Sequence, residues 1–168
     1  MNTPSKQYMV IIVRNNAGVL ARISSLFNQR AFNIDSLTVS TTDVPGISRI
    51  TVAATGDATI LDQLRSQTLK LYEVLEIYPV SEEDSLLREL LLLKVRVNDE
   101  NREQIASIAK SNHARVLDLT DDYLIIEMTA IPAHIDLFLQ LLEPFDIVEM
   151  CRTGATAIAK GKRTFQNK

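Results

Sequence analysis

The sequence of 168 residues has one cysteine, no tryptophan and few aromatic residues, 5% in all. A lone cysteine, Cys151, excludes both an internal disulfide and a cysteine-based zinc cluster. No apolar run approaches the roughly 20 residues that a membrane helix needs. Leu90–Leu93, between Glu89 and Lys94, instead suits a buried strand. Residues 1–6 lack the apolar core of a secretion signal, so we expect a cytoplasmic protein with an aliphatic core.

The net charge of the chain is also small. Eighteen basic and 21 acidic side chains give a formal net charge of −3, which argues against a nucleic-acid partner because phosphates favour a basic one. Apolar residues make up 46% of the chain and charged residues 23%, both ordinary for a globular protein. The length suits one domain or two small ones. We expect neither a nucleic-acid nor a membrane partner.

The first half of the chain predicts the order strand, helix, strand, strand, helix, strand. Tyr8–Val13 is a nearly continuous apolar run, typical of a strand buried on both faces. The remaining elements follow from apolar residues at helical spacing or in strict alternation, separated by turn residues. The predicted strands are 8–13, 36–41, 49–54 and 71–80, and the predicted helices are 20–31 and 57–69.

The same order recurs after a polar stretch, Ser81–Ser85, which we interpret as a linker. Predicted strands are 90–97, 115–120, 123–129 and 147–153, predicted helices 101–111 and 133–143, and the tail 160–168 is expected to be frayed. The fold class is therefore α+β: two ferredoxin-like βαββαβ domains in tandem, residues 1–80 and 86–168. Helices cover one face of such a sheet, so the other face gives each unit a reason to pair with another copy.

A catalytic constellation is not evident. His113 follows Asn112 near a helix end and His134 opens a helix, and both fit capping or surface roles. Cys151 lies in a predicted strand, where an inert buried thiol is the usual case. The acidic run Glu82–Asp84 fits a solvated linker better than a metal site. With no Walker loop, G-x-G-x-x-G or H-E-x-x-H motif, we predict no catalytic residue, no metal ligand and no stand-alone enzyme.

The turn that joins the first strand to the first helix, Asn15-Asn16-Ala17-Gly18-Val19-Leu20, suits a ligand. A helix N-terminus offers free N–H groups and partial positive charge to a carboxylate. Asn15 both donates and accepts, which suits a zwitterion, and Gly18 lets a ligand approach the backbone. The alternative is an ordinary turn without a ligand, in which Asn15 or Asn16 caps the helix. The predicted binding residues are Asn15, Ala17, Gly18, Val19, Leu20, Asn33 and Ile34.

Residues 6–161 resemble the small regulatory subunits of acetolactate synthase (acetohydroxyacid synthase), with an ACT domain first. The first-domain resemblance rests on Asn-x-x-Gly-x-Leu at 15–20, on 30–39, on 47–51 and on Lys70–Leu75. The second rests on Glu89–Val95 and on Arg152-Thr153-Gly154. The first-domain motifs are specific only in combination, and those of the second are less specific. Where the family often has an acidic residue before the ligand asparagine, this chain has Arg14, which bears on affinity or pH response.

The resemblance implies a subunit that binds valine and controls a separate catalytic subunit carrying thiamine diphosphate, FAD and Mg²⁺, with no cofactor in this chain. The complex would condense two pyruvates to 2-acetolactate and CO₂, or pyruvate with 2-oxobutyrate. It also implies a homodimer through ACT domains paired edge to edge. Asn15 and Gly18 of one chain would then meet Asn33 and Ile34 of the other.

Three other functions share the predicted element order. An RNA-binding domain would carry exposed aromatic residues on its central strands, where this chain has Ile12 and Ile50. A metal chaperone would have Cys-x-x-Cys in the first turn, which contains no cysteine. An ACT-type regulator of another amino-acid enzyme remains the serious alternative, since one fold serves many ligands. The preferred effector among valine, leucine and isoleucine stays open.

Overall fold

A computed structural model describes residues 5–29, 34–56 and 58–165 of the chain. They divide into two compact units, residues 1–86 with 154–168, and residues 87–153, each of which is considered by itself. Across the described ranges, no helix combines the length and the apolar character that crossing a membrane requires.

The first unit contains an antiparallel four-stranded sheet with strand order β2-β3-β1-β4. This is the βαββαβ order and the ferredoxin-like topology that the sequence predicts. Each strand begins or ends within a few residues of its predicted bounds. The elements are β1 (Ser5–Arg14), α1 (Val19–Gln29), β2 (Ile34–Thr41), β3 (Ile47–Gly56), α2 (Ala58–Thr68) and β4 (Val74–Val80).

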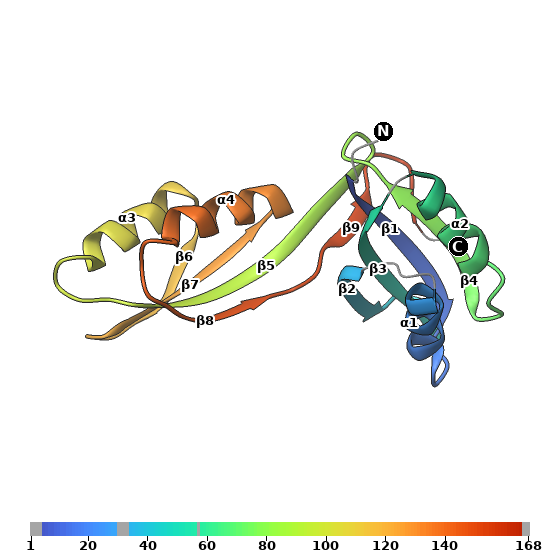
Figure 1. Ribbon diagram of the computed structural model, residues 1–168, viewed down its shortest axis with the longest axis horizontal. Coiled ribbons are helices and arrows are strands. Elements are labelled where there is room, and N and C mark those ends of the chain that lie inside the picture. The colour runs from blue at the N-terminus through green and yellow to red at the C-terminus, as the bar shows by residue number, and fades with distance from the viewer. Residues whose placement is uncertain (1–4, 30–33, 57, 166–168) are drawn as a thin grey trace. The chain divides into compact units, whose positions relative to one another are not determined.

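Helices α1 and α2 lie on one face of this sheet (Figure 1). Strand side chains at alternate positions, such as Ile11 and Val52, meet Ile23 and Phe27 of α1 and Leu64 of α2 in one core. Burying each of these large side chains contributes about 1.5–3 kcal/mol. The helical spacing of apolar residues in the sequence thus predicts the inward face of α1 correctly.

The opposite face of the sheet is covered by the chain's own C-terminal residues. Val10, Thr51 and Ala53 point to that face, and all three are buried. Strand β9 (Thr156–Ala159), which the sequence does not predict, pairs with β5 (Ser85–Arg96) and buries Ala155 and Ala157. We expected residues 154–168 to belong to the second domain; in the structure they group with the first unit.

The expectation of a frayed tail is wrong for residues 160–165. Phe165 is buried, and its ring centroid lies 5.3 Å from that of Tyr78 on β4. Arg49 of β3 donates to the carbonyl of Ala157 and lies 5.4 Å from the Phe165 ring. Burial lowers the pKa of Arg49 from its usual value. The buried Phe165 ring and these contacts hold the tail against the sheet. The sequence does not predict this because the segment is too short to show a helical or strand periodicity.

The second unit has the sheet order β6-β7-β5-β8, with α3 and α4 together along one side (Figure 1). Within β5, Leu91 and Leu93 are buried whereas Leu92 is 36% exposed, so the leucine run is a strand with one buried face. The helices supply Ile105, Ile135 and Phe138 to its core. The further elements are α3 (Arg102–Ser111), β6 (Arg115–Leu119), β7 (Tyr123–Ala130), α4 (Pro132–Leu142) and β8 (Ile147–Arg152).

Arg152 at the end of β8 binds two carboxylates. Its Nε lies 2.6 Å from Glu89 Oε2, and Nη1 lies 2.5 Å from Asp136 Oδ1 on α4. Burial lowers the pKa of Arg152, but the hydrogen bonds to Asp136 and Glu89 raise it more, so the pKa lies above its usual value. Because Glu89 is itself buried, this guanidinium neutralises a carboxylate that would otherwise be strongly destabilising.

Gly154, in the C-terminal segment, packs closely against β2. A Cβ at this position would lie 2.6 Å from Thr38 Oγ1 and 3.2 Å from the backbone nitrogen of Leu37. We expect Gly154→Ala to lower the free energy of unfolding by about 1–3 kcal/mol, the usual range for overpacking, in urea titrations.

The matched control is Thr38→Ala, which removes the buried hydroxyl oxygen that the new Cβ would meet. In a double-mutant cycle, Thr38→Ala should recover part of the loss caused by Gly154→Ala. Strictly additive effects of the two substitutions would contradict the close approach.

Candidate functional site

The turn between β1 and α1 is held by backbone hydrogen bonds. The Asn15 amide donates to the Gly46 carbonyl (2.8 Å), which ties the turn to the loop before β3. The Val19 amide donates to the Asn16 carbonyl (3.2 Å), and the Arg22 amide to the Gly18 carbonyl (3.1 Å). The remaining first-turn N–H groups of α1 have no acceptor within the helix. The turn therefore presents a helix N-terminus on a fixed backbone.

Gly18 has a φ of +83°, in the left-handed region that favours glycine. No atom lies within 4 Å of the position that a Cβ would occupy there. The glycine is thus required by the backbone conformation rather than by crowding, and the space above it is open to a small molecule.

The predicted binding side chains differ in their accessibility. Asn15, Asn16 and Ala17 are exposed, and no hydrogen bond from either asparagine side chain to another described residue caps the helix. Leu20 is 40% exposed at the rim, whereas Val19 is buried in the first core. Leu20 can therefore offer an apolar surface to a ligand, whereas the Val19 backbone amide already donates to the Asn16 carbonyl.

Arg14 is held against the chain just before β4. Its Nη1 donates to the Tyr72 carbonyl at 2.8 Å, and its guanidinium carbon lies 4.7 Å from the centre of the Tyr72 ring. The Arg14 backbone amide donates to the Glu73 carbonyl at 2.8 Å. The basic residue that departs from the family pattern is thus occupied by contacts of its own chain.

Sequence reasoning missed an ion pair beside the turn. Arg22 on α1 lies 2.5 Å from Glu73 Oε1, and the Glu73 side chain is only 12% exposed. A mostly buried carboxylate is stable when a paired cation neutralises it, so this pair fastens the start of α1 to the entry of β4. The predicted strand 71–80 contains two carboxylates, Glu73 and Glu76, and the sequence alone does not single out Glu73 as the buried one. Ala21, Arg22, Ser25, Leu26 and Leu71 line a hollow of about 350 Å³ beside the pair.

The structure does not bring Ile34 to the turn within one chain. Ile34 begins β2 and pairs with Ala54, which pairs with Gln7, whereas Arg14 before the turn pairs with Ile47. Gln7 and Arg14 are seven positions apart on β1, which is about 23 Å at roughly 3.3 Å per residue. Asn33, the other residue predicted to face the ligand here, lies outside the described residues.

The two histidines, expected to be separate surface or capping residues, line one cavity of about 300 Å³ in the second unit. His113 follows Asn112, the C-cap of α3, and has a φ of 57°, in keeping with a helix stop; His134 Nε2 lies 3.4 Å from Asn112 Oδ1. Cys151 was expected to be buried, but it is exposed, because it pairs with Leu92 on the face of the sheet opposite the core that contains Leu91 and Leu93. No group of three or more metal-ligating side chains occurs among the residues placed by the structure.

Residues 9–76 match the family model of the AHAS small subunit-like ACT domain, and residues 88–161 match that of the small subunit of acetolactate synthase. The chain is 36% identical over 162 residues to a probable acetolactate synthase small subunit of Methanothermobacter thermautotrophicus, covering 96% of each. It is 37% identical over 153 residues to that of Mycolicibacterium smegmatis, covering 91% of this chain and 90% of the relative.

A crystal structure of an acetolactate synthase small subunit from Thermotoga maritima superposes with a TM-score of 0.86 at 30% identity. The alignment covers 95% of this chain and 99% of that one. Similarity of sequence and fold thus extends over both units.

The backbone requirement at Gly18 can be measured directly. Gly18→Ala should lower the free energy of unfolding by about 1–2 kcal/mol, the cost of placing an L-residue in the left-handed region. Gly18→Asn should cost less, since asparagine tolerates that region better. Urea titrations with unchanged m-values would measure both, and equal stability of all three proteins would argue against the left-handed turn.

Proposed function

The chain belongs to the acetolactate synthase small-subunit family, and from that premise we propose that it binds valine and regulates a separate catalytic subunit. The observation that carries the proposal is the open left-handed turn at Gly18 ahead of a helix N-terminus, within a chain whose two units both match the family. The match of residues 88–161 favours acetolactate synthase over another amino-acid enzyme.

In this proposal the chain itself is not catalytic and acts in the cytoplasm. The complex condenses two pyruvates to 2-acetolactate and CO₂, or pyruvate with 2-oxobutyrate. Thiamine diphosphate, FAD and Mg²⁺ belong to the catalytic subunit, and no cofactor is assigned to this chain. These assignments rest on family membership, and on relatives named as small subunits, which implies a larger catalytic partner.

The ligand's carboxylate would accept hydrogen bonds from the first-turn amides of α1, where the helix dipole favours negative charge. The Asn15 amide group would serve the ammonium and carboxylate together, and Leu20 would contact the aliphatic side chain. The exposure of Asn15 and Leu20 and the open space above Gly18 support this arrangement.

A second copy would complete the site through the β2 edge. Strand β2 is the outer strand of its sheet and Val39 is 44% exposed, so its outer backbone groups can pair with another strand. Antiparallel pairing of two β2 strands would set Ile34 of one chain near Thr41 of the other. Thr41 pairs with Ser48, and Ser48 with Val13, so the partner's turn would follow closely.

Regulation would follow from differential binding. Valine bound between two ACT units favours one arrangement of the pair. The equilibrium between the two states of the enzyme then shifts by the difference in their affinities for valine. Coupling of this kind is typically about 1–3 kcal/mol, or roughly 5–150-fold in affinity.

Gly18→Asp should abolish inhibition by valine, because it places a carboxylate where the ligand's carboxylate belongs, while activation of the catalytic subunit survives. The assay mixes the purified chain with a catalytic subunit and measures acetolactate formation with and without valine. Gly18→Ala is the matched control, since it shares the backbone strain without the charge. An undiminished valine response of Gly18→Asp would refute this site.

Sharing of the site between chains predicts complementation. Gly18→Asp and Asn33→Ala homodimers should each lose high-affinity valine binding. In a mixed dimer, one site carries both substitutions and the other carries neither, so calorimetry on the refolded mixture should recover one high-affinity site per hybrid dimer. Absence of recovery in a mixture shown to contain hybrids, or a strictly monomeric chain in sedimentation, would contradict the shared site.

A further inference from the structure

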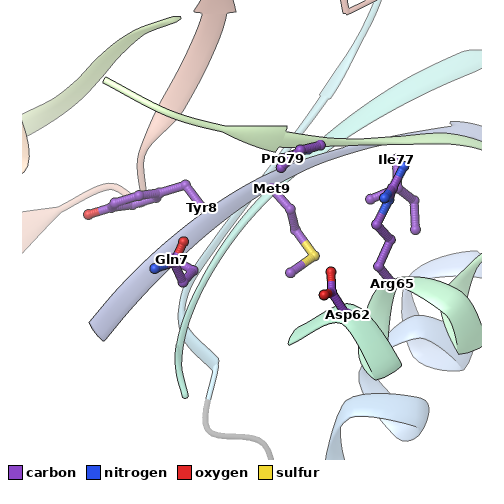
Figure 2. A pocket seen from close by; sticks show the side chains of 7 residues that line it. All are labelled: Gln7, Tyr8, Met9, Asp62, Arg65, Ile77 and Pro79. Carbon is purple, nitrogen blue, oxygen red and sulfur yellow. The ribbon is translucent and has the colours of Figure 1, made fainter. Parts of the chain in front are cut away.

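The first unit contains a cavity of about 170 Å³ at the opposite end of β1 from the turn at Gly18. It opens between β1 and β4 on one side and α2 on the other, and Figure 2 shows its surroundings. The seven described residues that line it are Gln7, Tyr8, Met9, Asp62, Arg65, Ile77 and Pro79.

One wall of this cavity is apolar and fixed. Met9 and Ile77 are both 5% exposed and belong to the core of the unit. Pro79 pairs with Met9 across the two strands. Figure 2 shows the Met9 side chain directed toward α2, whereas Tyr8 points away from the space. A small aliphatic group could be buried against this wall, since the two strands behind it pair without a register shift from Tyr8 to Ile12.

The facing wall carries one charge of each sign. Asp62 and Arg65 are three residues apart on α2, so they lie on the same side of the helix. Figure 2 shows the Asp62 carboxylate directed toward Met9 and the Arg65 side chain rising toward Ile77. Neither side chain forms an ion pair with another residue that the structure describes. Their charges are therefore available to a ligand.

We propose that this cavity is a second amino-acid site, contained within one chain, for an α-amino acid with a small aliphatic side chain. Arg65 binds the carboxylate through the fork of its guanidinium, a geometry that matches a carboxylate in two parallel hydrogen bonds. Asp62 accepts from the ammonium, and the aliphatic side chain packs on Met9, Ile77 and Pro79. The site is independent of the shared site at Gly18, and either can exist without the other.

The chemistry of the walls restricts the ligand. Removing either charge from the ligand leaves one of the two side chains without its partner, so both charges are needed. A volume of about 170 Å³ admits a small ligand only, since pockets for drug-sized molecules are roughly 300–1,000 Å³. Because the two charged side chains are solvent-exposed, we expect an affinity on the order of 1 mM, weaker than at a fully enclosed site.

The test uses the full chain carrying Gly18→Asp, which removes the shared site, with valine as the probe in calorimetry or ligand-observed NMR. We expect one remaining weak site per chain. Adding Arg65→Gln or Asp62→Asn should weaken it at least tenfold. Lys70→Gln is the charge control, because Lys70 is exposed in the same unit and does not line the cavity. Melting temperatures equal to that of the Gly18→Asp chain would show that the added substitutions leave the protein folded.

Two analogues separate a zwitterion site from a merely apolar one. Isovalerate lacks the ammonium and isobutylamine lacks the carboxylate, and both should bind at least tenfold more weakly than valine. Equal binding of all three, no effect of Asp62→Asn and Arg65→Gln, or no valine binding to the Gly18→Asp chain would each overturn the proposal. If Gly18→Asp left both the inhibition and the tight site intact, the proposed shared site at Gly18 would be refuted. The cavity site would then be tested by comparing valine binding to the wild-type chain and to the Arg65→Gln chain.

Discussion

Strand β1 is buried from Met9 to Val13 on both faces, and the rest of the first unit is organised around it. One face is covered by α1 and α2, the other by residues 154–165 of the same chain. Because β1 is packed on both faces and paired with β3 and β4, the positions of its two ends are fixed. The turn that leads to α1 follows one end, and the cavity beside Asp62 and Arg65 lies at the other.

The turn at Gly18 depends on contacts that reach well beyond it. Arg14 and Arg22 bind adjacent residues at the entry to β4, through the Tyr72 carbonyl and the Glu73 carboxylate. The Asn15 amide reaches the loop before β3. A left-handed glycine alone gives a flexible bend, but here two neighbouring segments hold it, so the first-turn amides of α1 are oriented before any ligand arrives. Preorganisation of this kind lowers the entropy lost on binding.

The sequence predicts the order of elements in both units, because strict alternation and helical spacing are strong local signals. It even predicts burial of both faces of 8–13, though not which residues supply the second cover. That cover comes from alanines 155 and 157 and from Phe165, a segment too short and too mixed in polarity to show a period. Cys151 illustrates the same limit: a strand is predictable from its own residues, but which of its faces the helices cover depends on the rest of the fold.

For the candidate site, the residue types predict a turn at 15–18, and Gly18 has the left-handed conformation of a turn glycine; binding of a ligand there stays a prediction. The pair Arg22 and Glu73 was missed because its partners are 51 residues apart and each is unremarkable alone. The cavity at Asp62 and Arg65 was missed for a related reason. Its apolar wall belongs to strands, its charges to a helix, and only the folded chain sets them opposite each other.

The return of residues 154–165 to the first unit also has a consequence for biosynthesis. About 67 residues, 87–153, separate the two parts of that unit along the chain. At roughly 5–20 residues per second, a ribosome needs several seconds to make them. During that interval Val10, Thr51 and Ala53 are without their final cover, so the nascent N-terminal half presents an apolar sheet face to chaperones. Because the chain is synthesised from its N-terminus, the first unit cannot be completed until residues 154–165 have been made.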